Sequence, residues 1–76
     1  MKTYPIDSLA YVDTLIGLIP CKVLAIEEKI IVKLTANRGP YKRGEVLDYP
    51  KMWVIPRECI FVRGGQYRIR NNYKWE

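Results

Sequence analysis

The sequence contains no histidine, and its only serine is Ser8. Histidine is the commonest general base and a frequent metal ligand, so the usual starting points for catalysis and metal binding are missing. The two cysteines form no Cys-x-x-Cys motif, and the adjacent acidic pair Glu27-Glu28 is expected at a solvated hairpin tip. We therefore predict a non-enzymatic chain without cofactor or metal. An active site formed between subunits of an oligomer is the remaining enzymatic alternative.

Long apolar runs are missing as well, and no secretory signal is visible in the sequence, so we expect no leader. The longest apolar stretch, residues 15–20, contains Gly17 and is far shorter than the roughly 18–20 residues of a membrane span. Without a leader, the two cysteines indicate reduced thiols in an intracellular protein. We expect a cytoplasmic chain that does not contact a membrane, with Cys21 and Cys59 as small buried hydrophobic residues. A disulfide between them is the alternative.

The chain has 76 residues, which predicts one domain over residues 1–76. Apolar residues make up 49% of it, enough for a globular fold despite a net charge of +5. Residues 1–30 carry a net charge of −1, whereas residues 31–76 carry +6. The basic excess therefore belongs to the second part of the chain, and it favours an anionic partner or simply promotes solubility.

Residues 8–16 allow two interpretations. Asp7 or Ser8 could cap a short helix whose apolar residues recur at spacings of three and four, ending before Gly17. The same segment is rich in residues that favour strands, so an extended arm is nearly as well supported. Both alternatives stay open from the sequence alone.

From Ile19 onward, apolar and polar residues alternate with the period of a β-strand. Residues 19–35 are expected to form an antiparallel hairpin that turns at Glu27-Glu28. Residues 37–44 hold two glycines, a proline and three cations, which indicates a loop. Further strands are expected at residues 45–49, 52–55, 60–63, 66–70 and 73–75, with turns at 50–51, 64–65 and 71–72. The expected core is Ile19, Val23, Ala25, Ile30, Val32, Leu34, Val46, Val54, Ile60 and Val62, with Trp53 partly buried.

Two stretches resemble the Src-homology-three type of barrel. Residues 40–47, Pro-Tyr-Lys-Arg-Gly-Glu-Val-Leu, are similar to that family's diverging turn, where a glycine permits a tight loop. Residues 53–60, Trp-Val-Ile-Pro-Arg-Glu-Cys-Ile, are similar to its segment in which a proline starts a single 3₁₀ turn. The resemblance implies an all-β fold: a small antiparallel barrel of five or six strands with a short N-terminal helix or arm.

The departures from that family bear on function. Cys59 stands where the family has a groove tyrosine, and the hairpin at residues 19–35 precedes the first matched stretch. This order resembles prokaryotic and ribosomal variants of the barrel, which often bind RNA or proteins. The resemblance therefore does not imply recognition of proline-rich peptides. The chain is also similar in general character to short proteins of phages and mobile elements, for which the location would be a host cytoplasm.

Cations and aromatic residues gather in the second part of the chain and predict a nucleic-acid-binding surface. Cations on a loop and on alternate strand positions can neutralise several phosphates, while aromatic rings stack on bases. The candidate cations are Arg38, Lys42, Arg43, Arg63, Arg68, Arg70 and Lys74. The candidate aromatic residues are Tyr41, Tyr67, Tyr73 and Trp75, for which packing in the core is the favoured alternative.

A protein-interaction module is the second hypothesis. Tyrosine and arginine are also enriched at protein interfaces, so the same residues suit a protein partner. The chain would then be a subunit of an assembly, or a phage-type inhibitor or regulator of a host protein. It would be a monomer or a homodimer. The hairpin after Gly64-Gly65 is suited to pairing with another chain or with its own copy, which would give the homodimer.

Overall fold

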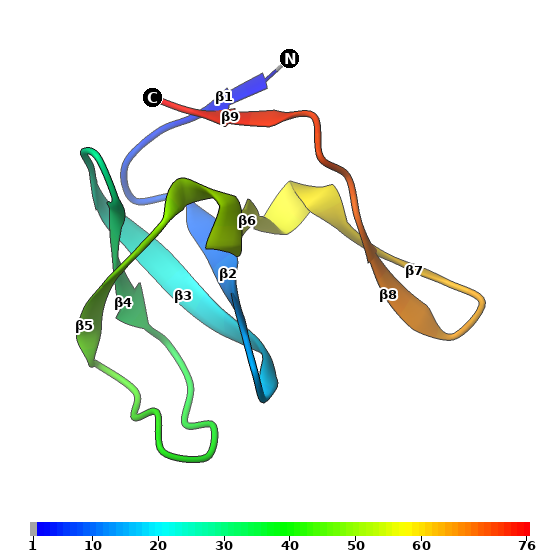
Figure 1. Ribbon diagram of the computed structural model, residues 1–76, viewed down its shortest axis with the longest axis horizontal. Helices are drawn as coiled ribbons and strands as arrows, with labels where there is room; N and C mark the ends of the chain where they lie inside the picture. Colours follow the sequence, from blue (N-terminus) through cyan, green and yellow to red (C-terminus); the bar gives the residue numbers. More distant parts are fainter. Residues whose placement is uncertain (1) are drawn as a thin grey trace.

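The computed structural model describes residues 2–76 (Figure 1), where every regular element is a β-strand or a short 3₁₀ turn. The elements are β1 (Lys2–Tyr4), β2 (Leu9–Thr14), β3 (Gly17–Ile26), β4 (Ile30–Leu34), β5 (Val46–Tyr49), η1 (Lys51–Trp53), β6 (Val54–Pro56), η2 (Arg57–Cys59), β7 (Ile60–Arg63), β8 (Gln66–Ile69) and β9 (Tyr73–Trp75). None of the helices in this range is long and apolar enough to cross a membrane. The protein is thus a small all-β domain.

The central feature is an antiparallel sheet of five strands in the order β5-β4-β3-β2-β6. The expected hairpin at residues 19–35 is confirmed by the pairing of β3 with β4. Residues 9–14 form β2, so the extended alternative is correct for this segment and the helix is wrong. Asp7 adopts a φ of 71° in the turn before β2, which is not the extended backbone of a helix N-cap.

The sheet must be curved because its two edge strands are close in the sequence. β5 and β6 lie at opposite edges, four strand spacings or about 19 Å apart in a flat sheet. Only residues 50–53 join them, and three of these form the compact 3₁₀ turn η1. Within residues 2–76, however, β5 and β6 do not pair with each other. The structure therefore confirms an all-β fold with a curved, five-stranded antiparallel sheet, and no closure of this sheet into a barrel is detected among the described strands.

The core lies on the inner face of this sheet, where cross-strand partners such as Cys21 and Leu34 or Val23 and Val32 are buried together. The prediction is wrong for Val46 and Val62, which are 55% and 64% exposed. Trp53, which was expected to be partly buried, is 47% exposed. Val46 lies opposite Lys33 on the outer face, and Val62 belongs to a hairpin outside the sheet. Ala25 and Ile60 are partly buried. The prediction missed the buried residues Tyr4, Ala10, Val12 and Ile55, whereas the expected burial of Cys21 and Cys59 and the core-packing alternative for Trp75 are confirmed.

The two ends of the chain form a separate two-stranded ribbon, in which β1 and β9 run parallel (Figure 1). The prediction of an antiparallel barrel with an N-terminal helix or arm did not include this parallel pairing. The ribbon adds Tyr4 and Trp75 to the core, with their ring centroids 5.7 Å apart. The Trp75 ring N–H donates a buried hydrogen bond of 3.1 Å to the carbonyl of Val54. The ribbon is therefore attached to β6 of the central sheet.

Two prolines set the turns beside β6. The strand expected at residues 52–55 begins only at Val54, because Met52 and Trp53 belong to the 3₁₀ turn that follows Pro50. Pro56 ends β6, and η2 follows directly, so the 3₁₀ turn implied by the resemblance is present. Beyond η2, the chain enters β7 and β8 as a separate hairpin that leaves the sheet.

Candidate functional site

The β7–β8 hairpin extends away from the central sheet (Figure 1). Its two strands pair from Ile60 opposite Ile69 to Arg63 opposite Gln66, leaving Gly64-Gly65 as a two-residue loop. Both glycines have positive φ, 60° and 77°, as the commonest tight hairpin turn requires. The hydrogen bond of 2.8 Å from the Arg70 amide to the Cys59 carbonyl continues the pairing towards the body of the molecule.

The register of this hairpin separates its side chains into two faces. Alternate residues of a strand point to opposite sides, so Ile60, Val62, Tyr67 and Ile69 share one face. Phe61, Arg63, Gln66 and Arg68 share the other, and Arg70 follows in the same alternation. We call the first the apolar face and the second the cationic face. No acidic residue occurs between Cys59 and Trp75, so no carboxylate of this segment offsets the three arginines.

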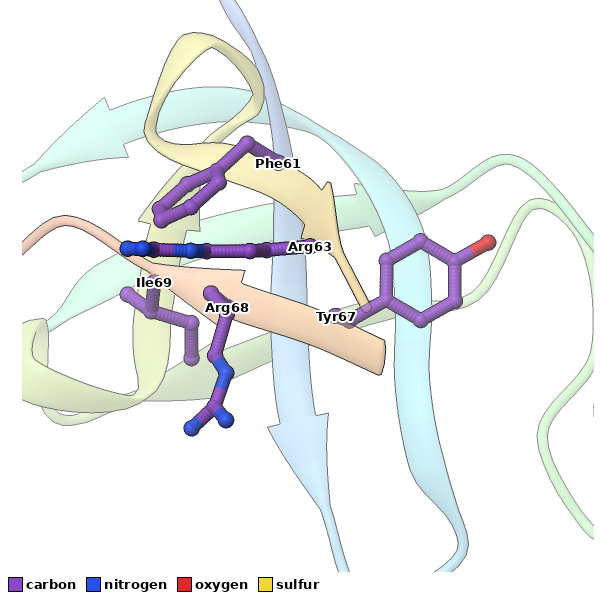
Figure 2. A pocket seen from close by; sticks show the side chains of 5 residues that line it. All are labelled: Phe61, Arg63, Tyr67, Arg68 and Ile69. Atoms are coloured by element: carbon purple, nitrogen blue, oxygen red, sulfur yellow. The ribbon is translucent and has the colours of Figure 1, made fainter. Parts of the chain in front are cut away.

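A hollow of about 510 Å³ lies against the hairpin and is lined by Phe61, Arg63, Tyr67, Arg68 and Ile69. Figure 2 shows the Arg63 side chain extended beside the Phe61 ring, whereas Arg68 points away from it. The Arg70 guanidinium carbon lies 5.0 Å from the centroid of the same ring, within the range of a cation–π contact. The Phe61 ring thus lies beside the Arg63 side chain and the Arg70 guanidinium, while the Tyr67 ring lies apart from them at the other end of this hollow, which we call the hairpin hollow.

The loop at residues 37–44 is fixed by its own polar groups. The backbone N–H groups of Arg43 and Lys42 donate to the side-chain oxygens of Asn37 and Glu45, both at 2.8 Å. Arg38 and Tyr41 exchange two backbone hydrogen bonds of 2.8 and 2.9 Å across the turn at residues 39–40. The loop therefore presents its three cations, Arg38, Lys42 and Arg43, from a well-defined backbone.

This loop is held against the β2–β3 turn, which lies between the loop and the hairpin in Figure 1. Gly39 has a φ of 53°, and a Cβ atom there would lie 3.0 Å from Cδ1 of Ile16. Arg38 lines a second hollow, of about 520 Å³, together with Tyr11 and Pro20 of the sheet and Tyr67 of the hairpin. We call this hollow the β3 groove. Among the loop cations, Arg38 is the one that the fold brings to the hairpin.

The remaining candidates lie elsewhere. Lys74 is exposed on β9, at the opposite end of the molecule from the β2–β3 turn (Figure 1). Trp75 is only 8% exposed, and Tyr73 is partly buried with its hydroxyl donating to the Met52 carbonyl at 3.4 Å. Tyr41 also packs against the core. These three rings therefore have packing roles, and Tyr67, 71% exposed, is the candidate aromatic residue that presents its ring to solvent.

Sequence reasoning missed a third hollow, of about 510 Å³, whose lining includes Lys22, Lys33, Thr35 and Arg43. Lys22 and Lys33 are direct partners across β3 and β4. We call this feature the lysine hollow. Each lysine taken alone fits the pattern of a solvated strand face. The signal that could have revealed the pair is the strand register, because the antiparallel pairing expected within residues 19–35 can place Lys22 opposite Lys33.

The perturbed ionisable groups belong to the core. Burial raises the pKa of the Cys21 thiol to about 12. The hydrogen bond with Cys59, together with burial, raises the pKa of Tyr4 to about 12. Cys21 and Cys59 are both buried, free thiols, as small hydrophobic residues would be. Within residues 2–76, no group of three or more cysteine or carboxylate side chains is arranged to hold a metal ion.

No protein-family model, curated protein or solved structure matches the chain. Its function is therefore inferred from its own residues and their arrangement.

Proposed function

We propose that this chain is a non-enzymatic module that binds nucleic acid, RNA or DNA, through the cationic face of the β7–β8 hairpin. The observation that carries the proposal is the hairpin register. It places Arg63 and Arg68 on one face of an exposed ribbon, with Arg70 following them over the Phe61 ring. A ribbon that extends from a folded body can reach a polyanion without displacing the core.

Phosphate groups are the natural ligands of such a face. Guanidinium groups bind phosphate oxygens through paired N–H donors, and arginine keeps its charge at any physiological pH. Tyr67, at the edge of the same hollow, offers an exposed ring on which a base can stack. The loop cations Arg38, Lys42 and Arg43 supply a second contact region, joined to the hairpin at Arg38.

The scaffold of this module, we propose, is a partly open barrel of the general Src-homology-three shape. Two observations support this shape: the short connection between the edge strands β5 and β6, and the 3₁₀ turn after Pro56. The ring centroids of Tyr49, at the end of β5, and Trp53, in η1, lie 6.3 Å apart, so the two rings pack together beside that connection. Slow amide exchange together with close cross-strand contacts between β5 and β6 in NMR spectra would establish closure.

A salt series tests the nucleic-acid proposal. The three arginine–phosphate contacts of the hairpin alone predict a slope of about −2 in log affinity against log salt for a single strand, and about −3 for a duplex, and contacts with the loop cations would make the slope steeper. Arg63→Gln combined with Arg68→Gln should weaken binding and reduce the magnitude of the slope by roughly 1 to 2. Fluorescence anisotropy with labelled oligonucleotides measures both quantities. Both arginines are exposed, so the double variant should remain folded.

The matched control is Lys29→Gln with Lys51→Gln, which changes the net charge equally at two exposed positions outside the hairpin. This control should bind as the wild type does. A wild-type chain that binds neither RNA nor DNA near physiological salt would refute the proposal. Equal losses in the two double variants would show that overall charge, and not the hairpin, determines binding.

A protein-interaction module is the second candidate, and the apolar face of the hairpin is the observation that favours it. Val62 and Tyr67 are 64% and 71% exposed although they are direct partners across the strands. Exposed apolar groups on an unaccompanied ribbon suit pairing with another chain or with a second copy. A shallow salt slope together with a mass that rises with protein concentration would favour this candidate.

A further inference from the structure

The three hollows follow one another over the surface, and we call their succession the track. The hairpin hollow and the β3 groove share Tyr67. The β3 groove contains Pro20, and the lysine hollow contains Lys22. These two residues alternate on one face of β3, about 7 Å apart, and the register shift of that strand lies beyond them, between Val23 and Ala25. A ligand can therefore pass from the hairpin to the lysine hollow without leaving the surface.

The lysine hollow has the charge of an anion site. Lys22 and Lys33 lie directly opposite each other, an arrangement of like charges that destabilises a sheet. Arg43 adds a third cation to the same hollow. Asp7 lies 3.6 Å from Lys22, whereas Lys33 and Arg43 form no salt bridge with a carboxylate in the described part of the chain. A bound phosphate group would relieve this repulsion.

The β3 groove has the lining of a base site. Tyr11, Pro20 and Tyr67 offer flat apolar surfaces, and Arg38 adds a planar guanidinium. Bases of a duplex are already stacked and paired, so they cannot enter such a hollow, whereas bases of a single strand can. The cationic face and the β3 groove also lie on either side of the hairpin. A flexible strand can contact both around Tyr67, but a rigid duplex cannot.

We propose that a single strand of nucleic acid follows this track, with bases in the β3 groove and a phosphate between Lys22, Lys33 and Arg43. The inference rests on the proposed function and adds two things to it: the form of the nucleic acid and a second phosphate site beyond the hairpin. Binding residues then include Lys22 and Lys33, which belong neither to the β7–β8 hairpin nor to the loop at residues 37–44.

The first experiment compares oligonucleotides of two lengths. Labelled single strands of about 4 and about 15 pyrimidine nucleotides, as RNA and as DNA, are titrated with the wild-type chain beside a duplex of the longer length. The longer single strand should bind at least about tenfold more tightly than the duplex, since bases in the groove add stacking contacts. Tyr67→Ala should remove most of this preference while the chain stays folded.

The second experiment uses Lys22→Gln combined with Lys33→Gln. This variant should bind the long strand several-fold more weakly and lower the magnitude of its salt slope by about 1, since one phosphate site is lost. The short strand should bind the wild type and the variant alike through the hairpin. Because the substitutions remove a repulsion, the variant should be at least as stable as the wild type in urea. Lys29→Gln with Lys51→Gln is again the control.

Asp7→Asn provides a test with the opposite sign. Asparagine tolerates the positive φ at this position, and the substitution removes the carboxylate beside Lys22. Affinity for the long strand should rise, and this gain should vanish when Lys22 and Lys33 are also replaced by glutamine.

The outcomes separate the two proposals. A wild-type chain without affinity for nucleic acid overturns both. If the wild type binds and the hairpin variant does not, the proposed function stands. The track is then overturned by preferential duplex binding, or by a lysine variant that binds the long strand as the wild type does.

Discussion

The packing role of Trp75 follows from its hydrogen bond. Tryptophan is amphipathic, and a buried indole N–H requires an acceptor. Here the acceptor is the carbonyl of Val54 at 3.1 Å, and the ring also contacts Tyr4 and Tyr73. The residue therefore joins the last strand of the chain to the sheet. Tyr67, by contrast, has a ring that is mostly exposed, so it is available to a ligand.

Substitution of Trp75 by phenylalanine should separate stability from binding. The change removes the indole donor and leaves the buried Val54 carbonyl without it, so the free energy of unfolding should fall by about 1–3 kcal/mol. Under conditions where the variant is folded, oligonucleotide affinity should equal that of the wild type. Urea denaturation followed by circular dichroism, together with anisotropy titrations, measures both. An unchanged stability with lost binding would instead make Trp75 a contact residue.

The β7–β8 hairpin is the element on which the proposed function depends most. A two-stranded ribbon alone is at best marginally stable in water, so its order depends on its turn and its attachment. The attachment is supplied by the Arg70–Cys59 backbone hydrogen bond, which continues the strand pairing towards the body, and by Ile60, which packs against the core. The turn depends on glycines with positive φ at residues 64 and 65. The hairpin can therefore open while the five-stranded sheet remains folded.

Two substitutions at Gly64 should show this independence. Valine is strained at a φ of 60° by about 1–2 kcal/mol, whereas asparagine is favoured before glycine in this turn. Gly64→Val should speed hydrogen exchange at the amides of β7 and β8, leave those of β3 and β4 protected, and weaken oligonucleotide binding. Gly64→Asn should leave exchange and affinity close to the wild type. Similar exchange in the two variants would show that the turn does not control the hairpin.

At the scale of the whole molecule, local pattern predicted most strands, because alternation and turn residues are properties of neighbours in the sequence. Pairing between segments that are distant in the sequence could not be predicted from local pattern. Lys2–Tyr4 pairs with Tyr73–Trp75 across nearly the full chain, and this pairing buries Trp75. Val46 and Val62 alternate correctly, yet are exposed because their elements lie at an edge and outside the sheet. The sequence could name candidate cations, but not Lys22 and Lys33 among them, because the hollows that group the cations depend on how the β7–β8 hairpin, the loop and the sheet meet.

The core groups Tyr4 and Cys21 predict how the stability of the whole molecule depends on pH. Folding raises the pKa of the Cys21 thiol from 9.0 to about 12 and that of Tyr4 from 10.0 to about 12. The unfolded chain therefore releases these protons at lower pH than the folded chain does. Their contribution to stability is complete below about pH 9, where both groups are protonated in both states. It falls as the pH rises towards 12.

Urea denaturation at a series of pH values should show this decline, with the midpoint constant below about pH 9 and falling steadily above it. Cys21→Ala is the informative variant. It removes the thiol that titrates first, so the decline should begin about one pH unit higher, where the tyrosine titrates in the unfolded chain. The variant should also be less stable at neutral pH, by about 1 kcal/mol, because a buried sulfur is lost. A midpoint that stays constant up to pH 11 would show that neither group is held protonated by the fold, and a decline identical in both proteins would exclude Cys21 as its source.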